Sequence, residues 1–222
     1  MRDNKTSQAA SLYDANVQKT IPRYTAFHEE TLALVKAVKG CPDTWLDAGC
    51  GTGRLIEKAG EYFGNLHFVA ADPSGAMLDI AKEKLADLDV EYVQTGSESL
   101  SYADRFDVIT AIMSHHYLNV EMRKNATEKC FAALKSGGLY VTFETIRPFS
   151  ERGTDIGLER WRRHQLDSGK PPEEVEKHIT RYGIELLPIS ISDHLEVLRA
   201  AGFVAVEILW VSGLQAGFYA IK

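Results

Sequence analysis

The residues that could do chemistry begin with an acidic side chain followed by three alternating glycines. Asp47 ends an apolar segment, and Gly49, Gly51 and Gly53 follow in the pattern G-x-G-x-G. Glycines at such a turn let the backbone bend tightly and let a ligand approach it with no Cβ in the way. A dinucleotide-binding loop would read G-x-G-x-x-G, but Arg54 stands where its third glycine belongs. The loop therefore indicates a ligand with cationic or hydroxyl groups near Asp47 rather than a pyrophosphate.

A second acidic residue, Asp72, follows the next apolar segment along the chain. A carboxylate at this point is the usual acceptor for ribose hydroxyls, because it can accept from both of them. The pair Asp72-Pro73 alone would equally be an ordinary turn, but after the glycine loop it favours ribose binding. Ser97 and Glu98 follow a third apolar segment, where their polar edges either reach an adenine amino group or are simply solvated.

Two adjacent histidines follow a fourth apolar segment, in the run from Met113 to Tyr117. Neighbouring side chains beyond a strand point in different directions, so one histidine lines a site while the other packs or caps. We expect His115 to line the site and His116 to lie behind it. Glu144 follows the fifth apolar segment and is a further candidate for proton transfer.

Apolar and amphipathic segments alternate from about residue 44 to 145, which indicates a parallel sheet with helices on both faces. The expected strands are Trp45–Ala48, His67–Ala71, Val90–Gln94, Phe106–Met113, Leu139–Phe143, Phe203–Trp210 and Leu214–Ile221. The last two form a hairpin, so the final strand runs antiparallel to its neighbour. The sequence predicts an α/β fold: a doubly wound, Rossmann-like, seven-stranded sheet, mostly parallel, with an antiparallel C-terminal hairpin and a helical lid.

Helix boundaries are predicted from caps and glycines. Ser74 is expected to cap a helix after the second strand, and Ser192 to cap a helix that Gly202 ends. The helix over 120–134 is expected to end in Lys135-Ser136-Gly137-Gly138, where a glycine adopts the left-handed conformation.

Residues 1–222 are expected to form a single domain with two additions to the sheet. The first is a helical cap over residues 1–40, and the second is a helical insertion over 146–190. The insertion carries balanced charges, so it is expected to be a lid, a solvated helical surface or the interface of a homodimer.

Composition narrows the class of protein. The chain carries 25 Lys and Arg against 31 Asp and Glu, a net charge of −6, which disfavours direct binding of nucleic acid. Cys41, Cys50 and Cys130 form neither a paired framework nor a metal-ligand spacing, so we expect reduced thiols, a cytoplasmic location and no metal site. The polar start predicts no signal peptide, and the absence of a long apolar run predicts no membrane span.

Three motifs together resemble those of the class I S-adenosylmethionine-dependent methyltransferases. Residues 47–53 resemble motif I, residues 71–78 resemble the ribose-binding motif, and residues 134–139 resemble the L-x-x-G-G turn before strand five. Residues 13–24 and 207–222 resemble one branch, which contains small-molecule methyltransferases and the carboxy-S-adenosylmethionine synthase of transfer-RNA modification. The carboxylate-binding arginine of that synthase finds no counterpart in register here, so its chemistry is not implied.

The resemblance implies that the cofactor is S-adenosyl-L-methionine. The residues implied to bind it are Asp47, Gly49, Cys50, Gly51, Gly53, Asp72, Pro73, Met77, Ser97, Glu98 and Met113. In this motif the residues at Pro73 and Met77 often pack on the adenine.

The resemblance also implies in-line displacement of a methyl group onto a nitrogen, oxygen or sulfur nucleophile of a small-molecule acceptor. Positioning supplies most of the catalysis because the sulfonium is already activated. A hydroxyl acceptor would also need a general base, for which His115, His116 and Glu144 are the candidates. The acceptor candidates outside the core are Tyr13, Tyr24, Arg160, Trp161 and His164.

Three functions of different class stay open. A small-molecule methyltransferase leads. A nucleic-acid-modification enzyme or a carboxy-S-adenosylmethionine synthase is the second reading, because the acidic balance does not count against making a modified cofactor. A non-catalytic S-adenosylmethionine-binding regulator is the third, and it is disfavoured because every cofactor element is intact.

Overall fold

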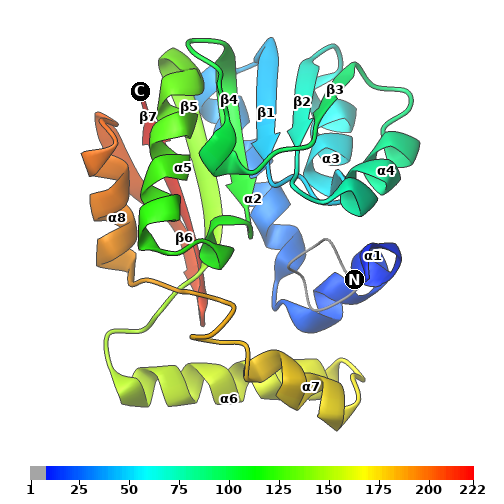
Figure 1. Ribbon diagram of the computed structural model, residues 1–222, viewed down its shortest axis with the longest axis vertical. Helices are drawn as coiled ribbons and strands as arrows, with labels where there is room; N and C mark the ends of the chain where they lie inside the picture. The colour runs from blue at the N-terminus through cyan, green and yellow to red at the C-terminus, as the bar shows by residue number, and fades with distance from the viewer. Residues whose placement is uncertain (1–8) are drawn as a thin grey trace.

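The computed structural model describes residues 9–222, and seven strands form one twisted sheet in the order β3-β2-β1-β4-β5-β7-β6 (Figure 1). The strands are β1 Thr44–Ala48, β2 His67–Ala71, β3 Val90–Val93, β4 Phe106–Ile112, β5 Leu134–Thr145, β6 Ala205–Ser212 and β7 Gln215–Ile221. Strands β1 to β5 pair in parallel, and β7 runs antiparallel to both β5 and β6. The predicted fold class is confirmed.

Helices cover both faces of the sheet and extend past one of its ends. They are α1 Ala10–Thr20, α2 Tyr24–Lys39, α3 Arg54–Phe63, α4 Gly75–Lys84, α5 Val120–Ala133, α6 Glu151–Asp167, α7 Pro172–Ile179 and α8 Ile191–Ala200. Helices α6 and α7 lie beyond the carboxyl end of β5, on the same side as α1 (Figure 1). Within residues 9–222 no helix is both long and apolar enough to cross a membrane.

Alternate residues of the strands build two separate apolar layers. Trp45 and Phe68 face the layer shared with α2, α3 and α4, whereas Leu46 and Val69 face the layer shared with α5 and α8. This period of two follows from the pleat of a strand. Each such side chain, fully buried, stabilises the fold by roughly 1.5–3 kcal/mol. The sheet is therefore held rigidly, which fixes the positions of the loops at its carboxyl edge.

Two local predictions were wrong. Helix α5 ends at Ala133 and the next residue, Leu134, is extended, because Leu134 already pairs with Phe106 in the sheet. The left-handed glycine, Gly137 at φ +70°, lies further on, in the turn within β5. Helix α8 is capped by Ser190 rather than by Ser192. The cap of α4 by Ser74 is confirmed, since its Oγ accepts from the N–H of Met77 at 3.2 Å.

The start of α8 is a reciprocal capping box. The Oγ of Ser190 accepts from the N–H of Asp193 at 3.2 Å, and the Asp193 carboxylate accepts from the N–H of Ser190 at 3.0 Å. Both donors would otherwise be unpaired at a helix N-terminus. The spacing S-x-x-D from Ser190 to Asp193 is the sequence pattern that would have identified this cap.

Ser190→Ala should lower the free energy of unfolding by about 1 kcal/mol, because it removes the acceptor for the N–H of Asp193. Urea denaturation measures the change. The matched control is Ser192→Ala, a substitution of the same type at an exposed position of the same helix, which should stay within about 0.5 kcal/mol. Equal losses in the two variants would contradict the capping box.

Candidate functional site

A cavity of about 270 Å³ opens at the carboxyl edge of the sheet. Its walls come from the loops after β1, β2, β3 and β4, the first turn of α3, and side chains of α1 and α2. The order of strands reverses between β1 and β4, and in open α/β sheets this switch point is where ligands bind. The cavity is therefore the candidate functional site.

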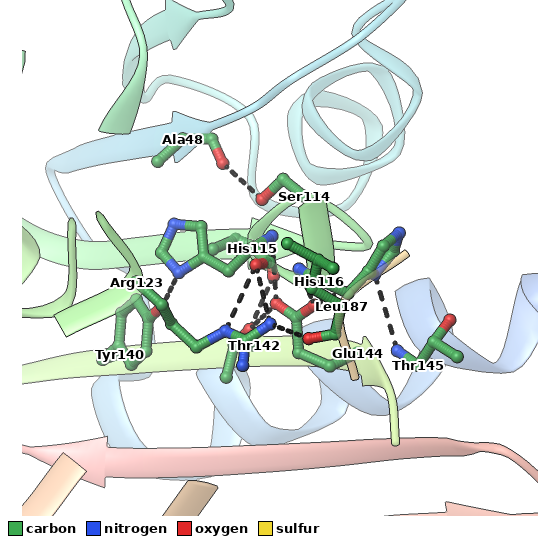
Figure 2. Close-up of polar contacts among 11 residues, drawn as sticks. Ala48, Ser114, His115, His116, Arg123, Tyr140, Thr142, Glu144, Thr145 and Leu187 are labelled. Atoms are coloured by element: carbon green, nitrogen blue, oxygen red, sulfur yellow. Dashed lines mark hydrogen bonds and ion pairs between the residues drawn. The ribbon is translucent and has the colours of Figure 1, made fainter. Parts of the chain in front are cut away.

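The glycine loop owes its shape to close approach of the backbone. Gly49 has φ +89°, and a Cβ there would overlap the Cβ of Ser114 from the neighbouring loop. The Oγ of Ser114 donates to the carbonyl oxygen of Ala48 at 3.0 Å, which holds the two loops together (Figure 2). Gly51 has φ +54° and lines the cavity. Only glycine is free of strain at both positions.

Asp72 joins the loop after β1 to the start of α4. Its carboxylate accepts from the N–H of Gly51 at 2.9 Å and from the N–H of Ser74 at 2.8 Å. The side chain is nearly buried, and it also lines the cavity. Gly51 and Asp72 are 21 residues apart in the sequence. The parallel pairing of β1 and β2 brings them together at the carboxyl edge of the sheet.

Asp47 is a buried carboxylate at the floor of the cavity. The Oγ1 of Thr110 donates to its Oδ1 at 2.7 Å, and Trp45 Nε1 donates to the same Thr110 oxygen at 2.9 Å. Burial raises the pKa of Asp47 to about 7, against the hydrogen bond from Thr110, and the charge of Asp72 adds to the rise. A cation placed beside Asp47 would favour its ionised form. The side chain thus suits a ligand that carries positive charge.

The turn after β4 is strained. Met113 has φ +55°, a left-handed conformation that costs a residue other than glycine of order 1–3 kcal/mol. Its N–H donates to the carbonyl oxygen of Phe143 at 2.7 Å. The turn brings Met113, Ser114 and His115 into the wall of the cavity. Such strain persists only where surrounding contacts hold it.

Those contacts come from Glu144, which lies behind the turn (Figure 2). Its Oε2 accepts from the backbone N–H of His116 at 2.8 Å and lies 3.0 Å from His116 Nδ1. Its Oε1 accepts from Thr142 Oγ1 at 2.8 Å and from the N–H of His115 at 3.3 Å. Burial alone would raise the pKa of Glu144, but the bond and charge of His116 outweigh it and hold the pKa at about 2.

Of the three candidates for a general base, only His115 lines the cavity. Glu144 and His116 are buried behind it and contact each other, and neither lines the cavity. The Nδ1 of His115 lies 3.3 Å from the hydroxyl of Tyr140. Burial lowers the pKa of His115, which therefore stays neutral near pH 7.

The proposed cofactor residues all line the cavity except Gly53. Gly53 has φ +78°, and a Cβ there would lie 2.7 Å from Leu85 Cδ1. It is therefore a packing position between the glycine loop and α4.

The acceptor candidates divide into two groups. Tyr13 and Tyr24 line the cavity, but no residue of 146–190 does so. Trp161 Nε1 donates to the carbonyl oxygen of Thr20 at 2.6 Å, and His164 Nε2 lies 3.2 Å from the carbonyl oxygen of Gln18. These two side chains therefore contact α1 and lie outside the cavity wall, and a role in acceptor binding stays a prediction. The last carbonyls of α1 lack partners within their own helix, and α6 supplies donors to them.

Arg160 is exposed on α6 and also lies outside the cavity wall. Sequence reasoning missed a different wall residue, His28 of α2, which lines the cavity. Its ring lies edge-on to Tyr24, with centroids 5.0 Å apart. The signal that could have found His28 is its spacing of one helical turn from Tyr24.

Comparisons with known proteins agree with this geometry. A family described as a methyltransferase domain matches residues 46–138. The carboxy-S-adenosyl-L-methionine synthase of Trichodesmium erythraeum is 24% identical over 208 residues, covering 91% of this chain and 82% of the synthase. The ubiquinone/menaquinone biosynthesis C-methyltransferase UbiE of Vibrio parahaemolyticus is 38% identical over 112 residues, covering 48% of this chain and 42% of that protein.

A solved structure extends the likeness over the fold. The plantazolicin methyltransferase BpumL, in complex with a triazolic desmethylPZN analog and SAH, superposes with a TM-score of 0.72 at 15% identity. The match covers 96% of this chain and 90% of that chain. At this level of identity the likeness establishes the arrangement of strands and helices.

Asp47→Asn should stabilise the ligand-free protein, and more strongly at pH 8 than at pH 5. The folded-state pKa of about 7 lies above the ordinary value of 3.8. The folded state therefore keeps a proton that the unfolded state has released, and stability falls as pH rises through this window. Asparagine cannot ionise, yet its Oδ1 still accepts from Thr110.

Urea denaturation at the two pH values measures the difference. Asp87→Asn, at an exposed position, is the control: it removes the same charge but leaves the buried carboxylate of Asp47 in place. An equal gain at pH 5 and pH 8 for the Asp47 variant would contradict the raised pKa.

Proposed function

We propose that this chain, which belongs to the superfamily of S-adenosylmethionine-dependent methyltransferases, transfers a methyl group to a nitrogen, oxygen or sulfur nucleophile of a small molecule. S-adenosylmethionine is the cofactor of this superfamily. The observation that carries the proposal is the convergence of Asp47, the glycine loop and Asp72 on one cavity at the switch point of the sheet.

The residues of the cavity fit this cofactor from end to end. Asp72 suits the two ribose hydroxyls, because its carboxylate can accept from both. Ser97 and Glu98 offer polar groups to an adenine, and Pro73 and Met77 offer an apolar surface for its ring. The fit rests on the types of side chain that the fold gathers in one cavity.

Asp47 and the loop after β4 would serve the reacting end of the cofactor. Asp47 suits the positively charged groups there, because a cation restores the ionised form that burial disfavours. When bound, the cofactor supplies a methyl group already activated on its sulfonium. The protein's main task is then to align the acceptor and exclude water.

His115 is the residue that would accept a proton from the acceptor. An amine or thiol needs little more than alignment and loss of a proton, whereas a hydroxyl needs a base in the wall. His115 lines the cavity, and its lowered pKa keeps the imidazole neutral and able to accept. Glu144 and His116 would act through it by holding the turn in place.

Asp72→Ala should weaken the binding of S-adenosylhomocysteine by about tenfold or more. Hydrogen bonds to a charged group contribute roughly 1.5–3 kcal/mol, and the ribose would lose such bonds. Isothermal titration calorimetry measures the affinity, and circular dichroism checks that the variant is folded. Asp79→Ala, on the exposed side of α4, is the control that should bind as the wild type does. A folded Asp72 variant with unchanged affinity would remove Asp72 from the site.

Carboxy-S-adenosylmethionine synthesis is the second candidate, and one observation favours it. Three synthases match 91%, 97% and 98% of this chain, whereas UbiE matches 48% of it. The first function predicts that the purified protein carries S-adenosylmethionine or its homocysteine product. The second predicts a carboxylated form of the cofactor.

Mass spectrometry of the ligand released from freshly purified protein tests these alternatives. The methyltransferase proposal expects unmodified S-adenosylmethionine or S-adenosylhomocysteine, and NAD as a control should not bind in calorimetry. A carboxylated cofactor would replace the first candidate by the second. Binding of NAD without either adenosyl compound would rule out both.

A further inference from the structure

A buried arginine lies behind the turn that carries His115. Arg123 of α5 is 3% exposed, and its guanidinium donates hydrogen bonds to backbone carbonyl oxygens only. Within residues 9–222 this side chain forms no ion pair. A charge is costly to bury without a carboxylate partner, so a neutral side chain would cost less at this position if it only filled space. The charge and the planar set of donors therefore need an explanation.

The guanidinium of Arg123 joins two loops. Its Nε and Nη2 both donate to the carbonyl oxygen of His115, each at 3.2 Å (Figure 2). Its Nη2 also donates to the carbonyl oxygen of Leu187 at 2.6 Å, and the N–H of Leu187 donates to the carbonyl oxygen of His116 at 2.7 Å. The segment that follows α7 is thus bonded to the turn after β4.

One peptide group of this turn is held between two opposite charges. The carbonyl oxygen of His115 accepts from Arg123, and the N–H of His116, in the same peptide group, donates to Glu144 Oε2 at 2.8 Å. Hydrogen bonds in which one partner is ionised are about twice as strong as neutral ones. A peptide plane held at both of its polar atoms cannot rotate, so the imidazole of His115 keeps its direction.

Arg123 and Glu144 also face the side chain of His115. All three line a second cavity of about 10 Å³ behind the turn, and all three are buried. A space of this size holds about one water molecule, so bulk water does not screen the charges that meet there. Burial lowers the pKa of His115, the anion of Glu144 raises it, and the cation of Arg123 lowers it.

Other titratable groups also surround the imidazole. The groups that face His115 are Glu144 and Tyr140 of β5, Arg123 of α5, His194 of α8, Glu98 of the loop after β3, and its neighbour His116. Burial lowers the pKa of His194 to about 4 and raises that of Tyr140 well above its ordinary value, so both are neutral near pH 7. Among the described residues that line the second cavity, Arg123 is the only lysine or arginine.

We propose that Arg123 is a positioning residue for His115: it fixes the peptide group after His115 and supplies the positive charge that offsets Glu144 beside the imidazole. The inference rests on the proposed function, in which His115 accepts a proton from the acceptor. Arg123 does not line the main cavity, so it acts through His115. Without the guanidinium, Glu144 would favour the protonated imidazole, which cannot accept a proton.

The first measurement follows the titration of His115 in the ligand-free protein by NMR of labelled histidine, with His115→Gln to assign the signal. Arg123→Gln should move the titration midpoint to higher pH, because it removes the cation and leaves Glu144 in place. Arg123→Lys keeps a positive charge and should leave the midpoint near that of the wild type. Lys124→Gln is the control: it removes a charge from the next, exposed position of α5 and should have no effect.

The second measurement reports on the hydrogen bonds themselves. The carbonyl ¹³C signal of His115 should move upfield in Arg123→Gln and in Arg123→Lys, because neither side chain can place two planar N–H donors on one oxygen. The signal should stay in place in Lys124→Gln. Charge and donor geometry are thereby separated, since lysine restores the first and not the second. Thermal unfolding checks that each variant is folded.

The inference is overturned if Arg123→Gln changes neither the titration of His115 nor its carbonyl signal. It is also overturned if Arg123→Lys moves the midpoint as far as Arg123→Gln does, because lost packing would then explain the shift. If Arg123→Gln does not fold, the wild type and Arg123→Lys decide, and a wild-type midpoint above the ordinary 6.5 contradicts the inference. Failure of the proposed function is a separate result, in which the wild type does not bind S-adenosylhomocysteine in calorimetry.

Discussion

The buried carboxylate of Glu144 is the interaction on which the candidate site depends. It accepts from two consecutive backbone N–H groups, those of His115 and His116, and from the hydroxyl of Thr142. These bonds hold the left-handed turn at Met113, which would otherwise relax to an ordinary conformation. The turn in turn presents His115 to the cavity. A carboxylate that does not line the cavity therefore sets the geometry of the cavity wall.

Two buried carboxylates in this molecule behave in opposite ways, and their partners explain the difference. The Oε2 of Glu144 meets the backbone N–H and the imidazole of His116, its Oε1 meets a backbone N–H and the hydroxyl of Thr142, and its pKa is about 2. Asp47 accepts a hydrogen bond from Thr110 and has a second carboxylate nearby, and its pKa is about 7. A buried carboxyl group with hydrogen-bond donors on both oxygens stays ionised without a ligand. A buried carboxyl group with fewer donors has a raised pKa, which a cationic ligand would lower. The first suits a structural role and the second a binding role.

Sequence patterns predicted what depends on neighbours in the chain or on the strand edge. Asp47 and Asp72 meet because parallel strands end at the same edge, and this follows from the order of elements. His28 was missed because its place in the wall depends on how α2 packs against α3. The contact of Trp161 with α1 was not predicted, because the polar helix α6 shows no clear apolar stripe and tertiary contacts alone set which side faces the protein. The pKa of Asp47 likewise depends on the depth of burial, which residue spacing does not contain.

Helix α1 contacts both the cavity and the α6–α7 segment. Trp161 and His164 contact carbonyl oxygens at the C-terminal end of α1, and Lys170 Nζ lies 3.2 Å from Thr20 Oγ1. Tyr13, near the start of the same helix, lines the cavity. Helix α6 therefore holds the C-terminal end of α1 in place. Substitutions in the α6–α7 segment would change the contacts that position α1, and with it Tyr13, without replacing any residue that lines the cavity. The shape of the cavity wall can then diverge during evolution through residues that lie outside the cavity, while the residues of its floor stay the same.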